Sequence, residues 1–158
     1  MMIPEAIRRE VETYHNEWRH PRLAPLVCSE LYALFPEETG TEMPSTMNWP
    51  EAWPNNMHAG VYFVFDRALR VMYVGMTTFF GARLSAHFPT RSERIRENYW
   101  KTGRPMFVAT VAVTEVFEAL ALEGYLIDKF QPPENSKGKL TNQMQLEPPS
   151  PQHPEGIE

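Results

Sequence analysis

Two short runs of residues that favour β-structure stand only four residues apart, and this spacing constrains the fold of the chain most. The runs are GVYFVFD (60–66) and VMYVGM (71–76), and both are rich in Val, Tyr and Phe. Such runs predict strands, and the short connection predicts a β-hairpin. MFVATVAV (106–113) predicts a third strand, and helices are expected from about Thr78 and over about residues 114–130. The predicted order is therefore strand, strand, helix, strand, helix.

The residues before this core predict an acidic helical extension. In residues 4–19 apolar side chains recur at helical spacing and predict a helix with an apolar stripe along one face. Such a stripe needs another surface to pack against. A second, shorter helix is expected over residues 29–35, followed by a linker or irregular wrap rich in Gly, Pro, Ser and Thr. The stripe could pack on the rest of the chain, or it could bind a protein partner or form a homodimer. Its members are Ile7, Val11, Tyr14 and Trp18.

Length and composition divide the chain into three segments. A chain of 158 residues suits one compact domain with appendages. We expect an extension and linker over 1–56, a catalytic domain over 57–140, and a disordered tail over 141–158, where the sequence is proline-rich and polar. The single cysteine, Cys28, excludes an internal disulfide and is expected to pack in the core. Without a secretory signal or a membrane-spanning stretch, a cytoplasmic protein with no membrane partner is the expectation.

The formal net charge of −5 conceals a basic middle segment. Residues 57–140 hold 11 basic and 8 acidic residues, whereas the flanking segments are acidic. Five basic residues between 91 and 104 suit contacts with nucleic-acid phosphates. A solvated helix face is an equally good interpretation of composition alone. The five residues are Arg91, Arg94, Arg96, Lys101 and Arg104.

The hairpin predicts that two tyrosines share one face of the sheet. If Asp66 lies opposite Val71, then Val64 faces Tyr73 and Tyr62 faces Gly75. A glycine opposite Tyr62 is expected to leave that face open, so that a substrate backbone can approach the phenol. The alternative is that both tyrosines are ordinary strand aromatics.

The next helix adds two candidate catalytic side chains. Arg83 and His87 stand four residues apart, which places them on the same helix face. A guanidinium binds phosphate oxygens with two nitrogens, and an imidazole exchanges protons near neutral pH. Together they suit a phosphodiester substrate, although each is also a common surface or packing residue.

Glu123 is the least expected residue of the last helix. Its helical neighbours Ala119, Leu120, Leu126 and Ile127 are apolar, and an unpaired carboxylate is rarely tolerated on a buried face. A positive partner is therefore expected. It is either an arginine in a salt bridge or a divalent cation such as Mg²⁺.

In sequence order these residues resemble the GIY-YIG nuclease superfamily. Gly60-Val61-Tyr62 and Tyr73-Val74-Gly75 match its two tripeptides, and an arginine, a glutamate and an asparagine follow in the expected order. The resemblance covers about residues 57–140 and implies a small domain with a three-stranded antiparallel sheet flanked by helices. The later motif residues are Arg83, Glu123 and Asn135.

The resemblance also implies roles for these residues. Tyr62 and Tyr73 would lie beside the attacking water, with one of them as general base, and Arg83 would neutralise the scissile phosphate. Glu123 would bind the metal, and Asn135 would hold the active-site backbone or the metal shell. Two further positions are informative: His87 matches the homing and restriction members, whereas Met76 stands where the nuclease of bacterial excision repair has a lysine.

The expected function is that of a metal-dependent endonuclease that hydrolyses phosphodiester bonds in DNA with Mg²⁺ or Mn²⁺ as cofactor. The sequence leaves two alternatives open. The enzyme could act on RNA or branched DNA, because phosphate contacts carry no base information. The same fold could instead serve as a non-catalytic module that binds nucleic acid or protein.

Overall fold

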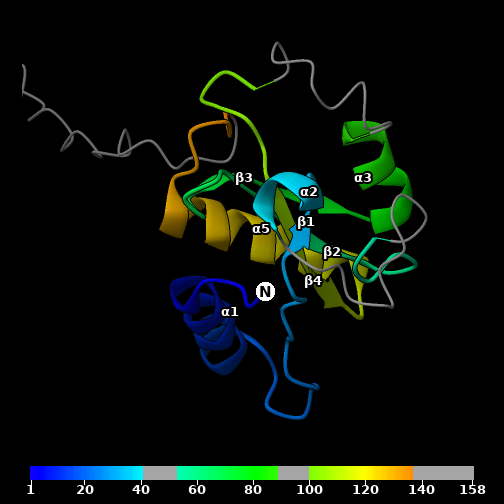
Figure 1. The fold of residues 1–158 in the computed structure, drawn as a ribbon. Helices are drawn as coiled ribbons and strands as arrows, with labels where there is room; N and C mark the ends of the chain where they lie inside the picture. The colour runs from blue at the N-terminus through cyan, green and yellow to red at the C-terminus, as the bar shows by residue number, and fades with distance from the viewer. Residues whose placement is uncertain (41–52, 89–99, 137–158) are drawn as a thin grey trace, which may run out of the picture.

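The fold is built on a four-stranded antiparallel sheet. The computed structural model describes residues 1–40, 53–88 and 100–136. The sheet has the strand order β1-β4-β2-β3, so that β3 forms one edge (Figure 1). The strands are β1 (Tyr32–Ala33), β2 (Ala59–Phe65), β3 (Val71–Thr77) and β4 (Phe107–Val113).

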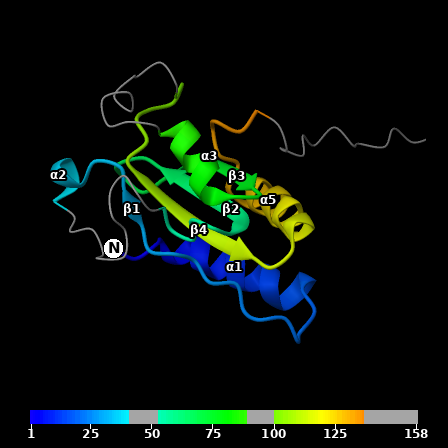
Figure 2. The same cartoon turned by 90° about the vertical axis from the view of Figure 1, so that its right-hand side faces the viewer.

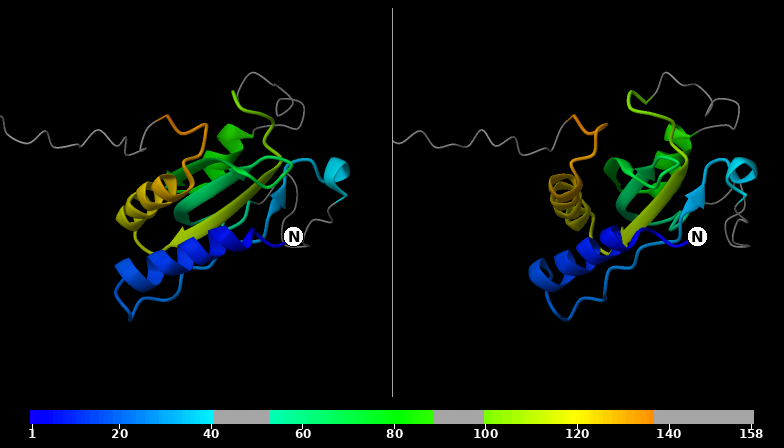
Figure 3. Two further views of the ribbon diagram at one scale, coloured as in Figure 1. Left: turned by 90° about the vertical axis from the view of Figure 1, so that its left-hand side faces the viewer. Right: turned by 60° about the vertical axis from the view of Figure 1, so that its left-hand side comes forward.

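Helices cover both faces of this sheet. The helix α3 (Phe80–His87) lies on one side, and α1 (Glu5–Trp18) and α5 (Val116–Phe130) lie on the other (Figures 2 and 3). The short α2 (Pro36–Thr39) follows β1. Because both faces are covered, every residue of β2 from Gly60 onward is buried. This mixed α/β arrangement confirms the predicted fold class.

The predicted hairpin register is correct at the two pairs that matter for the site. Val64 pairs with Tyr73 and Tyr62 pairs with Gly75. The predicted pair between Asp66 and Val71 is wrong, because an irregularity next to Phe65 makes this residue the partner of Val71. Asp66 instead closes the loop, and its Oδ1 accepts hydrogen bonds from the backbone N–H groups of Ala68 and Arg70.

The predicted helix over residues 29–35 is also wrong, because this segment is extended. Residues 31–35 are all buried, a pattern that a helix with one apolar face does not produce. Tyr32 pairs with Val108 and Ala33 with Phe107, which adds the fourth strand to a sheet expected to have three. Cys28 forms an isolated bridge with Val111 and is half-buried, and burial raises the pKa of its thiol to about 11.

The N-terminal extension is packed against the rest of the chain. Ile7, Val11 and Tyr14 are buried in the core, whereas Trp18 remains 69% exposed. The first three side chains are therefore unavailable to a homodimer or protein partner. Within the described ranges, no helix is long and apolar enough to cross a membrane. The expected disordered tail, 141–158, lies outside the described residues.

Candidate active site

Tyr62 and Tyr73 lie side by side on the sheet face that carries α3. Their ring centroids are 5.8 Å apart. A Cβ on Gly75 would lie 2.7 Å from the Tyr62 hydroxyl oxygen and 2.5 Å from a Tyr73 ring carbon. The expectation that Gly75 leaves room for substrate is therefore wrong, because the tyrosine rings themselves fill this space. Gly60, the first residue of the GVY tripeptide, has a similar steric role, since a Cβ there would lie 2.0 Å from the Val111 carbonyl oxygen.

The two tyrosines differ in environment. Tyr62 is 0% exposed, and burial raises the pKa of its phenol above the usual range, although Arg83 opposes this shift. Tyr73 is only half-buried. The ring of Trp100 packs edge-on against Tyr73 with centroids 5.9 Å apart, a contact that sequence reasoning missed. Tyr73 is therefore the tyrosine that solvent or substrate can reach.

Arg83 and His87 meet at the Tyr62 hydroxyl. Arg83 Nε donates a hydrogen bond of 3.2 Å to this oxygen, which lies 2.9 Å from His87 Nε2. Burial, followed by the charge of Arg83, lowers the pKa of His87 to about 4, so that His87 is neutral at pH 7. Tyr62 can then accept a hydrogen bond from Arg83 and donate one to His87. Arg83 also interacts with Tyr73, and its guanidinium forms no ion pair among the described residues, so that its charge is available to an anion.

The lowered pKa of His87 predicts a pH-dependent stability. In the unfolded chain this imidazole binds a proton near its ordinary pKa of about 6.5, whereas in the folded chain it does so only near 4. The unfolded state therefore binds more protons between these values, and stability falls as pH decreases through this window. We expect His87→Asn to lose less thermal stability than the wild type between pH 7 and pH 5. Equal losses in both proteins, measured by circular dichroism melting, would contradict this assignment.

Glu123 is held at the exposed edge of β3. Its Oε1 accepts a hydrogen bond of 2.9 Å from the backbone N–H of Met76. The salt bridge considered from the sequence is absent among the described residues, where Glu123 has no ion pair. Burial raises the pKa of Glu123, whereas the Met76 hydrogen bond and the charge of Arg83 lower it. Glu123 is also less buried than expected: it is only half-buried, and its neighbour Leu120 is 63% exposed.

Asn135 holds the same edge strand two residues away. Its Oδ1 accepts a hydrogen bond of 2.9 Å from Val74 N–H, and its Nδ2 donates one of 2.7 Å to the Val74 carbonyl. Asn135 is buried, and both hydrogen-bonding ends of its amide are used. Side chains thus satisfy the outward backbone groups of β3 at Val74 and the N–H at Met76. This geometry favours the backbone-holding role among the two alternatives for Asn135.

A pocket of about 330 Å³ joins several of these residues. Tyr73, Glu123 and Asn135 line it. Glu134, which sequence reasoning missed, lines it as well and binds Thr102 N–H and Oγ1 through its Oε1, both at 2.6 Å. The other lining residues are Leu120, Gly124, Ile127 and Ser136.

The pocket fits a hard divalent cation of the Mg²⁺ type. The Glu123 carboxylate has one oxygen on Met76 N–H, and its second oxygen has no hydrogen bond among the described residues. Mg²⁺ keeps several waters and commonly takes one or two carboxylates together with substrate phosphate. No cluster of three or more His, Cys, Asp or Glu side chains occurs in the described part of the chain. Glu123 would therefore hold the cation together with waters and substrate.

The structure describes only two of the five basic residues that are expected to contact nucleic-acid phosphates. Lys101 is exposed. Arg104 forms a forked ion pair with Glu38, at 2.9 and 3.1 Å, and its guanidinium lies 3.9 Å from the centre of the Phe35 ring. Arg104 is therefore engaged within the chain. The remaining three, Arg91, Arg94 and Arg96, lie outside the described residues.

Comparisons with known proteins identify the family of this chain. The model of the UvrC-like GIY-YIG domain family matches residues 58–136. Among solved structures, the GIY-YIG N-terminal endonuclease domain of UvrC from Thermotoga maritima, bound to its catalytic magnesium, is 22% identical. It aligns with 59% of this chain and 99% of its own, with a TM-score of 0.41.

Two point-mutant forms of that domain, each bound to its catalytic divalent cation, also have TM-scores of 0.41 and cover 59% of this chain. They are 22% and 21% identical, over 98% and 99% of their own chains. The comparison with curated proteins gave no match. Since the family model matches half of the chain, this protein belongs to the family of UvrC-like GIY-YIG domains.

Proposed function

We propose that this protein is an endonuclease that hydrolyses phosphodiester bonds in DNA with the help of Mg²⁺ or Mn²⁺. The observation that carries the proposal is the pocket in which Tyr73 and Glu123 meet. Arg83 is close enough to Glu123 to influence its ionisation, and its guanidinium has no ion pair among the described residues. A hydroxyl, a carboxylate and a guanidinium in this arrangement suit a phosphodiester and an attacking water.

The chain supplies groups for each part of the hydrolysis. Arg83 binds a non-bridging phosphate oxygen and stabilises the charge that builds up there. Tyr73 lines the pocket and holds the attacking water, whose oxygen forms the new bond to phosphorus. A divalent cation at Glu123 would act as a Lewis acid toward the leaving 3′-oxygen. The bond from phosphorus to this oxygen breaks, and the proton lost by the water balances the one gained by the 3′-oxygen, giving a 5′-phosphate and a 3′-hydroxyl.

Tyr62 has a supporting role in this proposal. It is fully buried, and its hydroxyl is already shared between Arg83 and His87. It therefore orients the Arg83 guanidinium from beneath. His87, which is neutral near pH 7, accepts a hydrogen bond from the Tyr62 hydroxyl and completes this support.

The difference between the tyrosines gives a testable result. We expect Tyr73→Phe to lower kcat by about 10²-fold or more, because a phenyl ring can neither hold the attacking water nor take part in moving its proton. Tyr62→Phe should lower kcat less, because Arg83 keeps its other nitrogens for phosphate. Single-turnover cleavage rates of both variants at saturating Mg²⁺ would check this. A larger loss in Tyr62→Phe would reverse the two assignments.

The proposed function is tested with the full chain and several substrates in parallel. Supercoiled plasmid, single-stranded DNA, branched DNA and RNA are incubated with Mg²⁺, Mn²⁺ or EDTA. Cleavage that requires a divalent cation and yields 5′-phosphate ends on DNA supports the proposal. Preferential cleavage of RNA would change the substrate, and binding without cleavage of any substrate by the folded protein would favour the non-catalytic module.

A further inference from the structure

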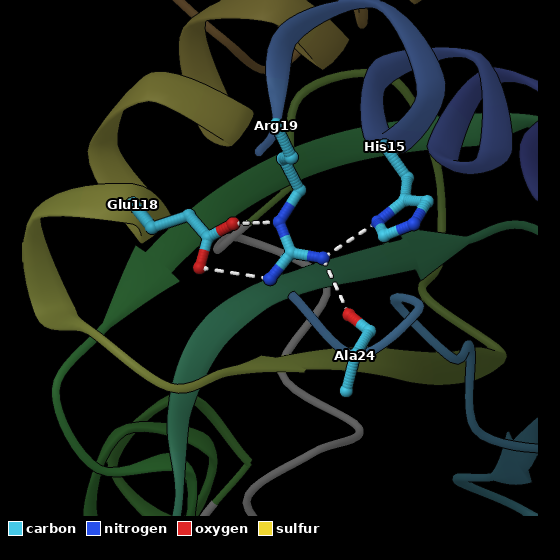
Figure 4. A network of polar contacts seen from close by, with 4 residues as sticks. All are labelled: His15, Arg19, Ala24 and Glu118. Carbon is cyan, nitrogen blue, oxygen red and sulfur yellow. Dashed lines mark hydrogen bonds and ion pairs between the residues drawn. The ribbon is translucent and has the colours of Figure 1, made fainter. Parts of the chain in front are cut away.

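The N-terminal extension is joined to α5 by a buried ion pair (Figure 4). Arg19 Nε donates to Glu118 Oε1, and Arg19 Nη2 donates to Oε2 at 3.3 Å. The side chains are only 4% and 9% exposed. Arg19 follows the last residue of α1, whereas Glu118 lies in the first turn of α5. Sequence reasoning assigned neither residue a role.

Arg19 Nη1 has two further partners. It donates to the Ala24 carbonyl at 2.6 Å and lies 2.6 Å from His15 Nδ1. An arginine is always protonated, so that His15 Nδ1 accepts this hydrogen bond. Arg19 thus fixes the end of α1, the loop after it and the start of α5 at one point. A side chain with this many fixed partners has little freedom to shift.

A second contact holds α5 farther along its length. The Tyr125 hydroxyl donates a hydrogen bond of 2.9 Å to Glu10 Oε2 of α1. The rings of Tyr14 and Tyr125 pack with centroids 5.2 Å apart. Glu118 and Tyr125 are seven residues apart and so lie on one face of α5. The candidate metal ligand Glu123 lies between them in sequence and extends from another face toward Met76 of β3.

We propose that Arg19 is a positioning residue for Glu123, acting through α5. The inference rests on the proposed function, in which the Glu123 carboxylate holds the cation. The contacts of Arg19 and Glu10 with one face of α5 restrict the rotation of α5 about its axis. They therefore also fix the position of the Glu123 carboxylate, which extends from another face of the same helix. A rotation of about 10° moves the tip of a helical side chain by about 1 Å. A displacement of this size in an active site can lower the rate by about 10²-fold.

The Met76 amide gives a readout that does not depend on cleavage. Its N–H is bound by Glu123 Oε1, whereas the neighbouring Val74 N–H is bound by Asn135, which follows α5. Hydrogen exchange of both amides is measured by NMR on the full chain without nucleic acid. In Arg19→Ala we expect the Met76 exchange rate to rise about tenfold relative to that of Val74. Arg8→Ala is the matched control, because Arg8 is exposed on α1 and pairs with Glu5 of the same helix.

Metal dependence gives the second readout. We expect the Mg²⁺ concentration for half-maximal cleavage to rise about tenfold in Arg19→Ala, since a displaced Glu123 binds the cation less well. Arg19→Lys keeps the charge without the forked contact and should fall between the wild type and Arg19→Ala. Arg8→Ala should match the wild type in both measurements.

The outcomes separate this inference from the proposed function. An Arg19→Ala protein that melts earlier but keeps the wild-type ratio of Met76 to Val74 exchange would show that Arg19 only stabilises the fold. If Arg19→Ala does not fold, Arg19→Lys decides by the same ratio: a raised ratio supports positioning and a wild-type ratio overturns it. If the wild type cleaves nothing, the proposed function fails, while the exchange ratio still tests whether Arg19 places Glu123.

Discussion

Replacing Glu123 with Gln is expected to lower metal-dependent cleavage by about 10³-fold or more while the protein stays folded. The amide of Gln can still accept the hydrogen bond from Met76 N–H that anchors the native side chain. It lacks the negative charge that holds a hard cation, and a bound metal contributes several kcal/mol of charge stabilisation in the transition state. The measurement is the single-turnover cleavage rate as a function of Mg²⁺ concentration.

Stability should respond in the opposite sense to activity. Burial raises the pKa of Glu123 in the folded chain, so that its ionised form favours the unfolded state. Glu123 therefore lowers the stability of the fold as pH rises through its folded-state pKa, and a neutral Gln removes this loss. We therefore expect Glu123→Gln to melt at the same temperature as the wild type or above it in EDTA at pH 7. If Glu123→Gln cleaves at the wild-type rate in Mg²⁺, Glu123 is not a metal ligand.

A matched control for this substitution is available on the same helix. Glu115 is exposed at the N-cap of α5 and makes no ion pair within the described segments. Glu115→Gln changes the net charge by the same amount without touching the pocket. Its cleavage rate should equal that of the wild type, so that a general effect of charge on nucleic-acid binding can be separated from a loss of metal.

Replacing Arg83 with Ala is expected to lower kcat by about 10² to 10³-fold with a smaller change in KM. This is the range observed when one preorganised donor to a developing charge is removed. Arg83 is exposed although its Nε binds the Tyr62 hydroxyl, so that the variant should remain folded. Arg83→Lys should recover only part of the rate, because an ammonium cannot bind Tyr62 and phosphate through separate nitrogens of one rigid plane.

The kinetic pattern decides how Arg83 acts. A raised KM with unchanged kcat would mean that Arg83 binds substrate and transition state equally, which contradicts the proposed role. Arg67→Ala provides the control, because Arg67 is exposed in the loop between β2 and β3. Its loss reports on general electrostatic attraction to nucleic acid. An equal decrease in kcat for Arg67→Ala would show that the assay measures overall charge.

Much of the nuclease-like core was predictable because its signals are local. Alternating β-formers and a short connection predicted the hairpin and placed Tyr62 opposite Gly75, as observed. The helical positions of Arg83 and His87 also predicted that they share a face, and both reach the Tyr62 hydroxyl. Local periodicity fixes which face a side chain occupies, and these residues needed no more than that.

The failures came where a distant segment decided the outcome. Residues 31–35 form an apolar run whose periodicity does not separate helix from strand, and only pairing with β4 settled it. The sequence drew attention to Glu123 as a carboxylate among apolar neighbours, yet the buried carboxylate of α5 is Glu118. Its partner, Arg19, lies 99 residues away. No local pattern reveals such a pair.

By itself, the sequence determined the order of the core strands and helices, the family motifs and the residues that could carry the chemistry. Only the tertiary structure decided which tyrosine is accessible, which backbone groups Glu123 and Asn135 bind, and how the N-terminal extension packs against α5. The physical reason is that strand and helix periodicity is written in neighbouring residues. Burial, pKa shifts and hydrogen-bond partners depend instead on which distant segments the folded chain brings into contact.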